Sequence, residues 1–365
     1  MKTKIYLTKE MFSERSRVLV ESGEFKATAF AYPGGVCALE VSSKRCRYIL
    51  LPFNGQQIWR FEADGEEMTM KSMFDEPVNT QDFESTYGGF LIHCGLTAMG
   101  NPSDEDPHPL HGELPLAHYQ SAWIETGEDE EGAFIRTGGS FLYRNALETA
   151  YVYSPSIRLN AGAAELIARD TIENKRSQPF PFMYMSHINW RPFEGARFIY
   201  GAPADKEHIE VFREDWGDAI SSEDAKRLDD YTLELMKDPT KADVIDKASQ
   251  VYDPELCLCI RYVPDEKGWA HSMQLRPDGR ACYVTFDTTY LPTGVRWMAR
   301  TGEEDSCGFC LPNTGNHKGR AYAIANNLRK ILAPHETIEL KYNIAVLDAE
   351  EAKKRAAEIE KTWKK

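Results

Sequence analysis

The main feature of the sequence is a succession of short β-rich runs separated by turn residues. Runs at 17–21, 26–32, 36–41, 47–52 and 57–62 are separated by Ser-Gly, Pro-Gly-Gly and Asn-Gly turns, and similar runs follow at 157–162, 165–174, 256–262, 281–287 and 338–346. Such closely spaced strands, which rarely alternate with helices, favour an all-β fold, a large antiparallel β-sandwich, over a parallel sheet.

Only two stretches have a helical pattern. Residues of about 221–250 are predicted to form a helical insertion that Pro239 interrupts. Residues of about 348–365 form an Ala/Glu/Lys-rich amphipathic pattern with Asp348 as the N-cap. Because no tandem repeat and no Pro/Gly/Ser-rich linker divides the chain, we expect residues 1–365 to form one domain with peripheral helices.

Composition limits the classes of partner. The chain has 57 acidic against 43 basic residues, a net charge of −14, which disfavours nucleic acid and anionic lipid as partners. We expect neither a membrane-spanning helix nor a secretion signal, and hence a cytoplasmic protein whose eight cysteines stay reduced. Cys307 and Cys310 have CxxC spacing but no second such pair, and we interpret them as two buried thiols.

Histidines mark the candidate site, since an imidazole both donates and accepts protons near neutral pH. Four of the nine histidines lie between positions 93 and 118. In His111-Gly112-Glu113 a carboxylate adjoins an imidazole, and the glycine would let the backbone approach a ligand closely.

A second histidine segment lies on a predicted half-buried strand. Period-two alternation places His187 and Asn189 on one face of it. Trp190 follows directly, and an aromatic ring beside hydrogen-bonding groups suits a sugar.

Four segments together resemble the aldose 1-epimerase (galactose mutarotase-like) family, and in particular a bacterial epimerase-like branch of it. They are residues 88–97, 110–113, 170–190 and 332–340, and the likeness extends over roughly 50–345. The resemblance implies a galactose mutarotase-like sandwich that interconverts the anomers of a small-molecule carbohydrate without a cofactor, as a monomer or homodimer. A base removes the proton of the C1 hydroxyl while an acid protonates the ring oxygen, which opens the ring.

The resemblance also implies roles for individual residues. His187 would be the acid, and His111 would bind the sugar near its ring oxygen. Arg60 and His93 would contact the sugar, unless they are an exposed strand charge and a satisfied strand histidine. Trp190 would stack on the sugar or belong to the core, and Asn189 would contact the sugar from the strand of His187.

One departure concerns the base. The family's glutamate is expected at position 311, where this chain has Leu311. Glu113 is the predicted substitute, because it adjoins His111 and stands where the family commonly has a basic residue. Glu303, Glu304 and Asp305 are the alternatives near the altered segment.

Two other functions remain open. His93, His111, Glu113 and His187 could form a metal site for isomerisation, elimination or hydrolysis of a modified sugar, although their spacing matches no short metal motif and we expect no metal. Because Leu311 cannot accept a proton, the second open function is that of a protein that binds a sugar without converting it. The remaining histidines, at 108, 118, 208, 271, 317 and 335, are predicted to lie in loops or at the surface.

Overall fold

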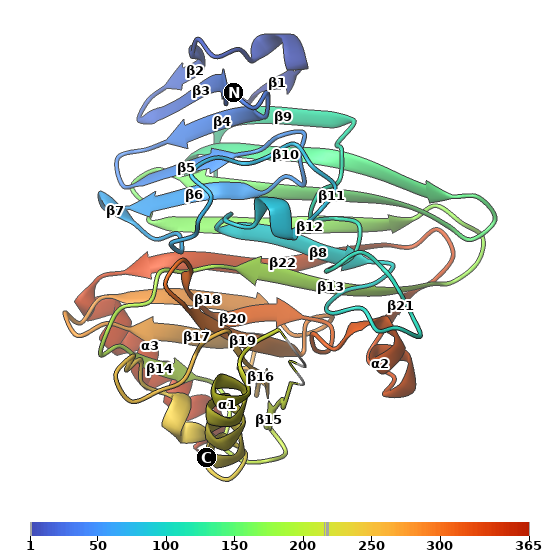
Figure 1. Ribbon diagram of the computed structural model, residues 1–365. Helices are drawn as coiled ribbons and strands as arrows, with labels where there is room; N and C mark the ends of the chain where they lie inside the picture. The colour runs from blue at the N-terminus through green and yellow to red at the C-terminus, as the bar shows by residue number, and fades with distance from the viewer. Residues whose placement is uncertain (1, 215, 217–218, 365) are drawn as a thin grey trace.

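The computed structural model describes residues 2–214, 216 and 219–364. Its described strands form two large antiparallel sheets of nine and 13 strands, which confirms the predicted β-sandwich (Figure 1). The smaller sheet has the order β1 (Thr3–Leu7), β9 (Ser121–Asp129), β10 (Gly132–Asn145), β11 (Thr149–Asn160), β12 (Glu165–Asn174), β22 (Thr337–Leu347), β18 (Ala281–Asp287), β17 (Trp269–Leu275), β14 (Arg197–Tyr200).

The larger sheet carries the strands that matter for the site. Its order is β15 (Ile209–Val211), β16 (Leu256–Arg261), β19 (Thr293–Arg300), β20 (Asp305–Asn313), β13 (Phe180–Ile188), β8 (Leu91–Leu96), β6 (Ile58–Ala63), β5 (Cys46–Leu50), β4 (Cys37–Ser42), β3 (Phe25–Ala31), β2 (Arg17–Ser22), with β21 (Lys330–Leu332) on β13 and β7 (Glu66–Glu67) on β6. β13 therefore lies in the middle of the sheet, between β8 and β20, which are distant from it in the sequence.

The core lies between the two sheets and contains a polar cluster. Asp170 on β12 is fully buried, and its Oδ2 accepts hydrogen bonds from the hydroxyls of Tyr153, Tyr184 and Tyr342 at 2.9, 2.8 and 3.2 Å. The Nδ1 of His93 lies 2.9 Å from the Tyr184 hydroxyl. We call these five residues the Asp170 cluster; its hydrogen bonds satisfy the three tyrosine hydroxyls, which would otherwise be costly to bury.

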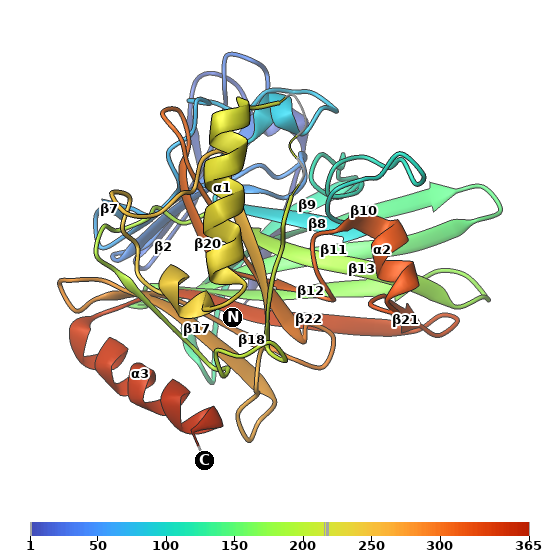
Figure 2. The same ribbon diagram turned by 60° about the horizontal axis from the view of Figure 1, so that its bottom comes forward.

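The helices lie outside the sheets. They are α1 (Ser222–Leu235), α2 (Gly319–Ala325) and α3 (Ala349–Trp363), with 3₁₀ turns at Lys9–Met11, Glu84–Thr86 and Pro239–Ala242. Figure 2 shows α1 in front of the strands and α3 at the lower left, and α3 packs against β14, β17 and β22 of the smaller sheet. Asp348 is the N-cap of α3 as predicted, since its side chain accepts a hydrogen bond from the Glu351 amide at 2.9 Å.

The predicted helical insertion is wrong in its extent. A helix occupies only Ser222–Leu235 of the stretch predicted at 221–250. Beyond it, Asp238 caps the short 3₁₀ turn, and the Ile245 amide then donates to the Ala196 carbonyl at 2.8 Å. Hydrogen bonds to a neighbouring segment therefore replace those of a helix after Pro239, whose ring cannot continue one. Among the described residues, no helix is both long and apolar enough to cross a membrane.

Replacing Asp170 tests how strongly its cluster stabilises the sandwich. Asp170→Ala removes the acceptor that three buried tyrosine hydroxyls share, so we expect the free energy of unfolding to fall by more than about 3 kcal/mol. Urea unfolding followed by tryptophan fluorescence measures this loss. Glu130→Ala, at an exposed position in the β9–β10 turn, is the control, and equal stability of the two variants would contradict the account.

Candidate functional site

A pocket of about 510 Å³ lies on the face of the larger sheet that points away from the smaller sheet. Strands β13, β16, β19 and β20 supply its floor, and loops from other parts of the chain cover it. Its aromatic lining comprises Phe74, Phe83, Tyr87, Trp216 and Trp297. Its ionisable lining comprises Glu84, His111, His187, Glu255, Glu304 and His317. Aromatic faces mixed with hydrogen-bonding groups suit a polyhydroxylated ligand that also has apolar C–H faces.

The alternation of β13 decides which predicted residues reach this pocket. Met185 and His187 face the pocket, whereas Tyr184 points into the core between the sheets. In the pairing of β13 with β8, His187 lies opposite Ile92 and Ser186 lies opposite His93. Directly paired residues share a face. His93 therefore belongs to the Asp170 cluster and does not line the pocket, contrary to the prediction that it contacts a sugar.

Asn189 holds the ring of His187 in one orientation. The sequence analysis placed these two residues on the same face of a strand, which allows their side chains to meet. The Asn189 amide nitrogen donates to the Gly89 carbonyl at 2.8 Å, so its Oδ1 is the atom that faces the His187 ring. That oxygen lies 2.6 Å from Nδ1 of His187, which must therefore carry a hydrogen. Nε2 is the ring nitrogen left for a ligand. Asn189 itself is fully buried and does not line the pocket, contrary to the prediction that it contacts the sugar.

His111 meets His187 in the pocket although 76 positions separate them in the sequence. Their ring centroids are 5.3 Å apart with an angle of 74° between the planes. Gly112, with φ of +85°, approaches backbone rather than a ligand, since a Cβ there would lie 2.2 Å from the Ala98 carbonyl oxygen. The glycine thus lets the chain turn sharply while His111 enters the pocket.

Burial favours the neutral form of both histidine rings in the free protein. It lowers the pKa of His187 to about 4, against the opposing effect of the hydrogen bond that His187 donates to Asn189. Burial, reinforced by the nearby His187, lowers the pKa of His111 well below its ordinary value. Both histidines are therefore neutral at pH 7.

The predicted base, Glu113, lies elsewhere. Its carboxylate accepts hydrogen bonds from the amides of Leu96 and Thr97 at 3.0 and 2.9 Å, and from the hydroxyls of Thr97 and Tyr151, both at 2.6 Å. It is not among the residues that line the pocket. The turn at Gly112 sends neighbouring side chains in different directions, so adjacency to His111 in the sequence was misleading.

Other carboxylates do line the pocket. Glu255 accepts a hydrogen bond from Nε1 of Trp297 at 2.5 Å, and Glu304 accepts one from the Met73 amide at 3.4 Å. The second oxygen of Glu304 is buried and has no hydrogen-bond partner among the described residues. Burial raises the pKa of both carboxyl groups. Leu311 lies in the same pocket and is fully buried, so an alkyl group occupies the place where a glutamate was expected.

Two further predicted contacts are absent from the pocket. Trp190 is fully buried among Phe61, Phe90 and Phe309, because the alternation that brings Asn189 to one face sends the next residue to the core. Arg60 donates instead to backbone carbonyls, those of Trp59, Gly88 and Phe74, at 3.0, 2.8 and 2.9 Å. It thereby holds part of the segment that covers the pocket.

The aromatic platform that the sequence analysis missed is Trp297. It lies on β19, and its ring centroid is 5.3 Å from that of His187. A strand pattern alone gives no sign of this contact, because β19 and β13 are not neighbours in the sheet. His317 was also missed: it was predicted at the surface, but only 5% of it is exposed, and it lines the pocket.

The four residues considered for a metal site do not converge, since His93 and Glu113 lie away from His111 and His187. Among the described residues, no group of three or more His, Cys, Asp or Glu side chains could hold a metal ion. Cys307 and Cys310 are buried thiols, as interpreted, and burial raises the pKa of each to about 12.

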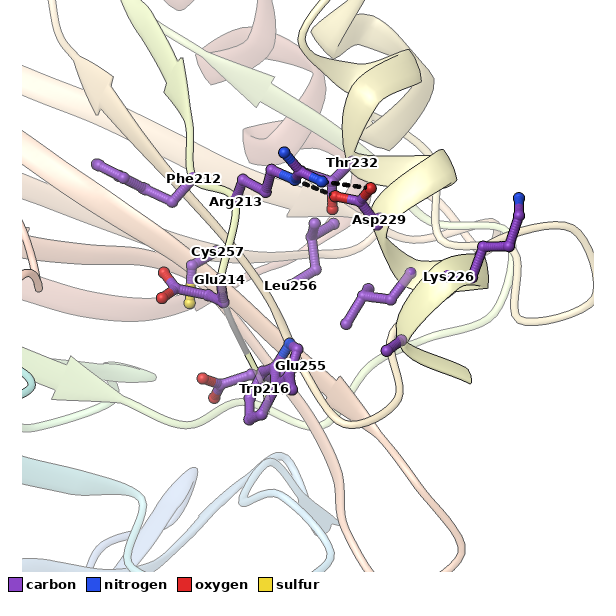
Figure 3. A pocket seen from close by; sticks show the side chains of 12 residues that line it. Phe212, Arg213, Glu214, Trp216, Lys226, Asp229, Thr232, Glu255, Leu256 and Cys257 are labelled. Carbon is purple, nitrogen blue, oxygen red and sulfur yellow. Dashed lines mark hydrogen bonds and ion pairs between the residues drawn. The ribbon is translucent and has the colours of Figure 1, made fainter. Parts of the chain in front are cut away.

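A second pocket of about 540 Å³ adjoins the first. Figure 3 shows it between α1 and the segment that includes Phe212 and Glu214. The two pockets share Trp216, Glu255 and Cys257. A ligand bound at the histidines could therefore extend toward α1.

The family model for a domain of unknown function (DUF4432) matches residues 34–346. None of the curated proteins compared with the chain matches it. A crystal structure from Klebsiella pneumoniae, named a "putative aldose 1-epimerase", is similar over 99% of this chain and 96% of its own, with a TM-score of 0.82 and 19% identity.

More distant structures have the same fold. A galactose 1-epimerase from Lactobacillus acidophilus is similar over 91% of this chain and 98% of its own, with a TM-score of 0.51 and 10% identity. A galactose mutarotase-like protein from Clostridium acetobutylicum is similar over 92% of this chain and 98% of its own, with a TM-score of 0.53 and 11% identity. The chain thus has the galactose mutarotase-like sandwich fold.

Replacing Glu113 separates a structural role from a catalytic one. Glu113→Gln places an amide nitrogen where backbone amides donate, so we expect the free energy of unfolding to fall by about 1–3 kcal/mol. Urea unfolding of this variant and of Glu105→Gln, an exposed loop control, measures the difference. Unchanged stability of Glu113→Gln would contradict the assignment.

Proposed function

The chain belongs to the DUF4432 family and has a galactose mutarotase-like fold, and from this we propose that it interconverts the anomers of an aldose at the pocket of His111 and His187. The observation that carries the proposal is the pair of neutral imidazole rings, 5.3 Å apart, in a pocket with aromatic faces and carboxylates. Anomer interconversion needs no more than two proton transfers around C1 and the ring oxygen, together with groups that hold the sugar.

We assign the acceptor role to His187. Its Nδ1 hydrogen is committed to Asn189, and its pKa of about 4 leaves Nε2 unprotonated at pH 7. Nε2 therefore accepts the proton of the C1 hydroxyl as the C1–O5 bond breaks and C1 becomes the carbonyl of the open chain. This assignment reverses the acid role that the family resemblance implies for His187.

The other lining groups bind the sugar. His111 hydrogen-bonds it near the ring oxygen, and the rings of Trp297 and Tyr87, which pack against His187, contact its C–H faces. Glu255 and Glu304 accept hydrogen bonds from sugar hydroxyls. Because Glu84, Glu255 and Glu304 line the pocket while His111 and His187 are neutral, a neutral aldose is favoured over uronates and sulfonated sugars.

Exchange spectroscopy by NMR tests the activity directly. Wild-type protein should accelerate anomer exchange of at least one neutral aldose, and His187→Ala should lower the rate by roughly 10²–10⁴-fold. His118→Gln, a change at an exposed histidine outside the pocket, is the control. Binding of aldoses without exchange above the spontaneous rate would replace the proposal with a sugar-binding protein that converts nothing.

The pH dependence tests which way His187 moves protons. An acceptor works only in its neutral form, so on the acid side of the profile kcat/KM should fall as the pH drops through about 4 and should level off by about pH 5. A donor would behave in the opposite way and lose activity as the pH rises above about 4. Circular dichroism at each pH excludes unfolding as the cause of the loss.

A further inference from the structure

His317 lies in the same pocket but has no role in the proposed reaction so far. It follows β20 in the sequence, and only 5% of it is exposed. Its ring packs against Phe212 with centroids 4.7 Å apart and planes at 88°. Its positive charge, when present, lowers the pKa of both His111 and His187, which places the three rings within electrostatic reach of one another.

A carboxylate holds one nitrogen of this ring. Oε1 of Glu214 lies 3.2 Å from Nε2 of His317, while Nζ of Lys318 lies 2.9 and 2.8 Å from the two oxygens of Glu214. Figure 3 shows the Glu214 carboxylate directed away from α1. These two partners lower the pKa of Glu214 to about 2, so it is ionised and only accepts hydrogen bonds.

The tautomer of His317 follows from this contact. Nε2 carries a hydrogen because its partner is an ionised carboxylate, which leaves Nδ1 as the nitrogen that exchanges a proton. Nδ1 is buried and has no hydrogen-bond partner among the described residues. Buried polar atoms usually have a hydrogen-bond partner, so this unpartnered nitrogen on a pocket-lining residue points to a ligand as the partner.

The backbone fixes His317 relative to His111. The Asn101 amide donates to the His317 carbonyl at 2.7 Å, and the His111 amide donates to the Gly100 carbonyl at 3.1 Å. Gly100 has φ of +84°, and a Cβ there would lie 2.1 Å from the His317 carbonyl oxygen. The two histidine segments are therefore locked together by the chain around Gly100.

The reaction needs a proton donor for the ring oxygen. Glu255 and Glu304 each accept a hydrogen bond from a fixed donor, Nε1 of Trp297 and the Met73 amide respectively. His317 instead donates through Nε2 to an ionised carboxylate, which stabilises a positive ring. The contact between Glu214 and His317 thus has the carboxylate–imidazole arrangement of a proton-transfer pair.

We propose that His317 is the second catalytic residue of the pocket and that Glu214 is its positioning residue. As Nε2 of His187 takes the proton of the C1 hydroxyl, the electron pair of the C1–O5 bond passes to O5, and Nδ1 of His317 protonates O5. Ring closure on the other face of C1 returns both protons, so the cycle consumes no co-reactant. This inference rests on the proposed anomer interconversion.

Kinetics provide the first test. His317→Gln should lower the NMR exchange rate by about 10²-fold with an intact fold, and imidazole added to His317→Ala should restore part of it. Glu214→Gln should lower kcat with little change in KM, a split that a purely structural contact would not produce. The charged and titratable groups around His317 are Glu214, Lys318, His111, His187 and Glu255, so Lys318→Met, which removes a partner of Glu214 but not the contact between Glu214 and His317, is the matched control and should lower kcat less than Glu214→Gln does.

A spectroscopic test does not depend on activity. In ¹⁵N-histidine NMR of the wild-type chain, the neutral His317 ring should carry its hydrogen on Nε2, and Glu214→Gln should weaken that preference. A His317 ring that carries its single hydrogen on Nδ1, or a tautomer preference that Glu214→Gln leaves unchanged, would overturn the inference even if no sugar is converted.

The two proposals can fail separately. Exchange in the wild type that persists at full rate in His317→Gln removes His317 from the mechanism and leaves the mutarotase proposal intact. Absence of exchange in the wild type removes the mutarotase proposal, and the tautomer of His317 seen by NMR then decides whether Glu214 positions its ring.

Discussion

The alternation of side chains along β13 is the constraint on which both the core and the site depend. One face of this strand contributes Tyr184 to the Asp170 cluster between the sheets, and the other places Met185 and His187 in the pocket. A shift of one residue in its pairing with β8 would exchange these faces and put His187 in the core. The buried aspartate cluster on one side therefore helps to fix the register that positions a candidate catalytic group on the other.

The proton-transfer chemistry proposed for the pocket depends on the charge states of its buried side chains. His111 and His187 are neutral because burial disfavours their charged forms, while Glu214 is ionised because Lys318 and His317 hold it. His187, which burial keeps neutral, suits the role of proton acceptor, and His317, which contacts an ionised carboxylate, suits the role of proton donor. The loss of a glutamate at Leu311 is then compatible with proton-transfer chemistry, since both transfers can pass through histidines.

The sequence was sufficient to predict the sandwich, because strand and turn patterns are local. The hairpin of β11 and β12, the strand Ala281–Asp287 and the cap at Asp348 all follow from residues adjacent in the chain. The end of α1 at Leu235 does not follow from adjacent residues, since hydrogen bonds to the segment around Ala196 take the place of further helical ones.

The site was predicted only in part for the same reason. His187 and Asn189 lie two residues apart on one strand, and the pairing of His111 with His187 came from the family resemblance. Glu113 and Trp190 were misplaced because adjacency in the sequence says little about direction after a turn or across a strand. Trp297, Glu255 and His317 come together through sheet order and loop packing, to which no short motif corresponds.

A crystal structure of the wild-type protein with the neutral aldose that it exchanges fastest tests the central claim most directly. The account predicts a sugar in the pocket of His111 and His187, with its C1 hydroxyl about 3 Å from Nε2 of His187 and its ring oxygen on the side of His317. A sugar whose C1 points away from His187, or one bound only in the adjoining pocket beside α1, would contradict it.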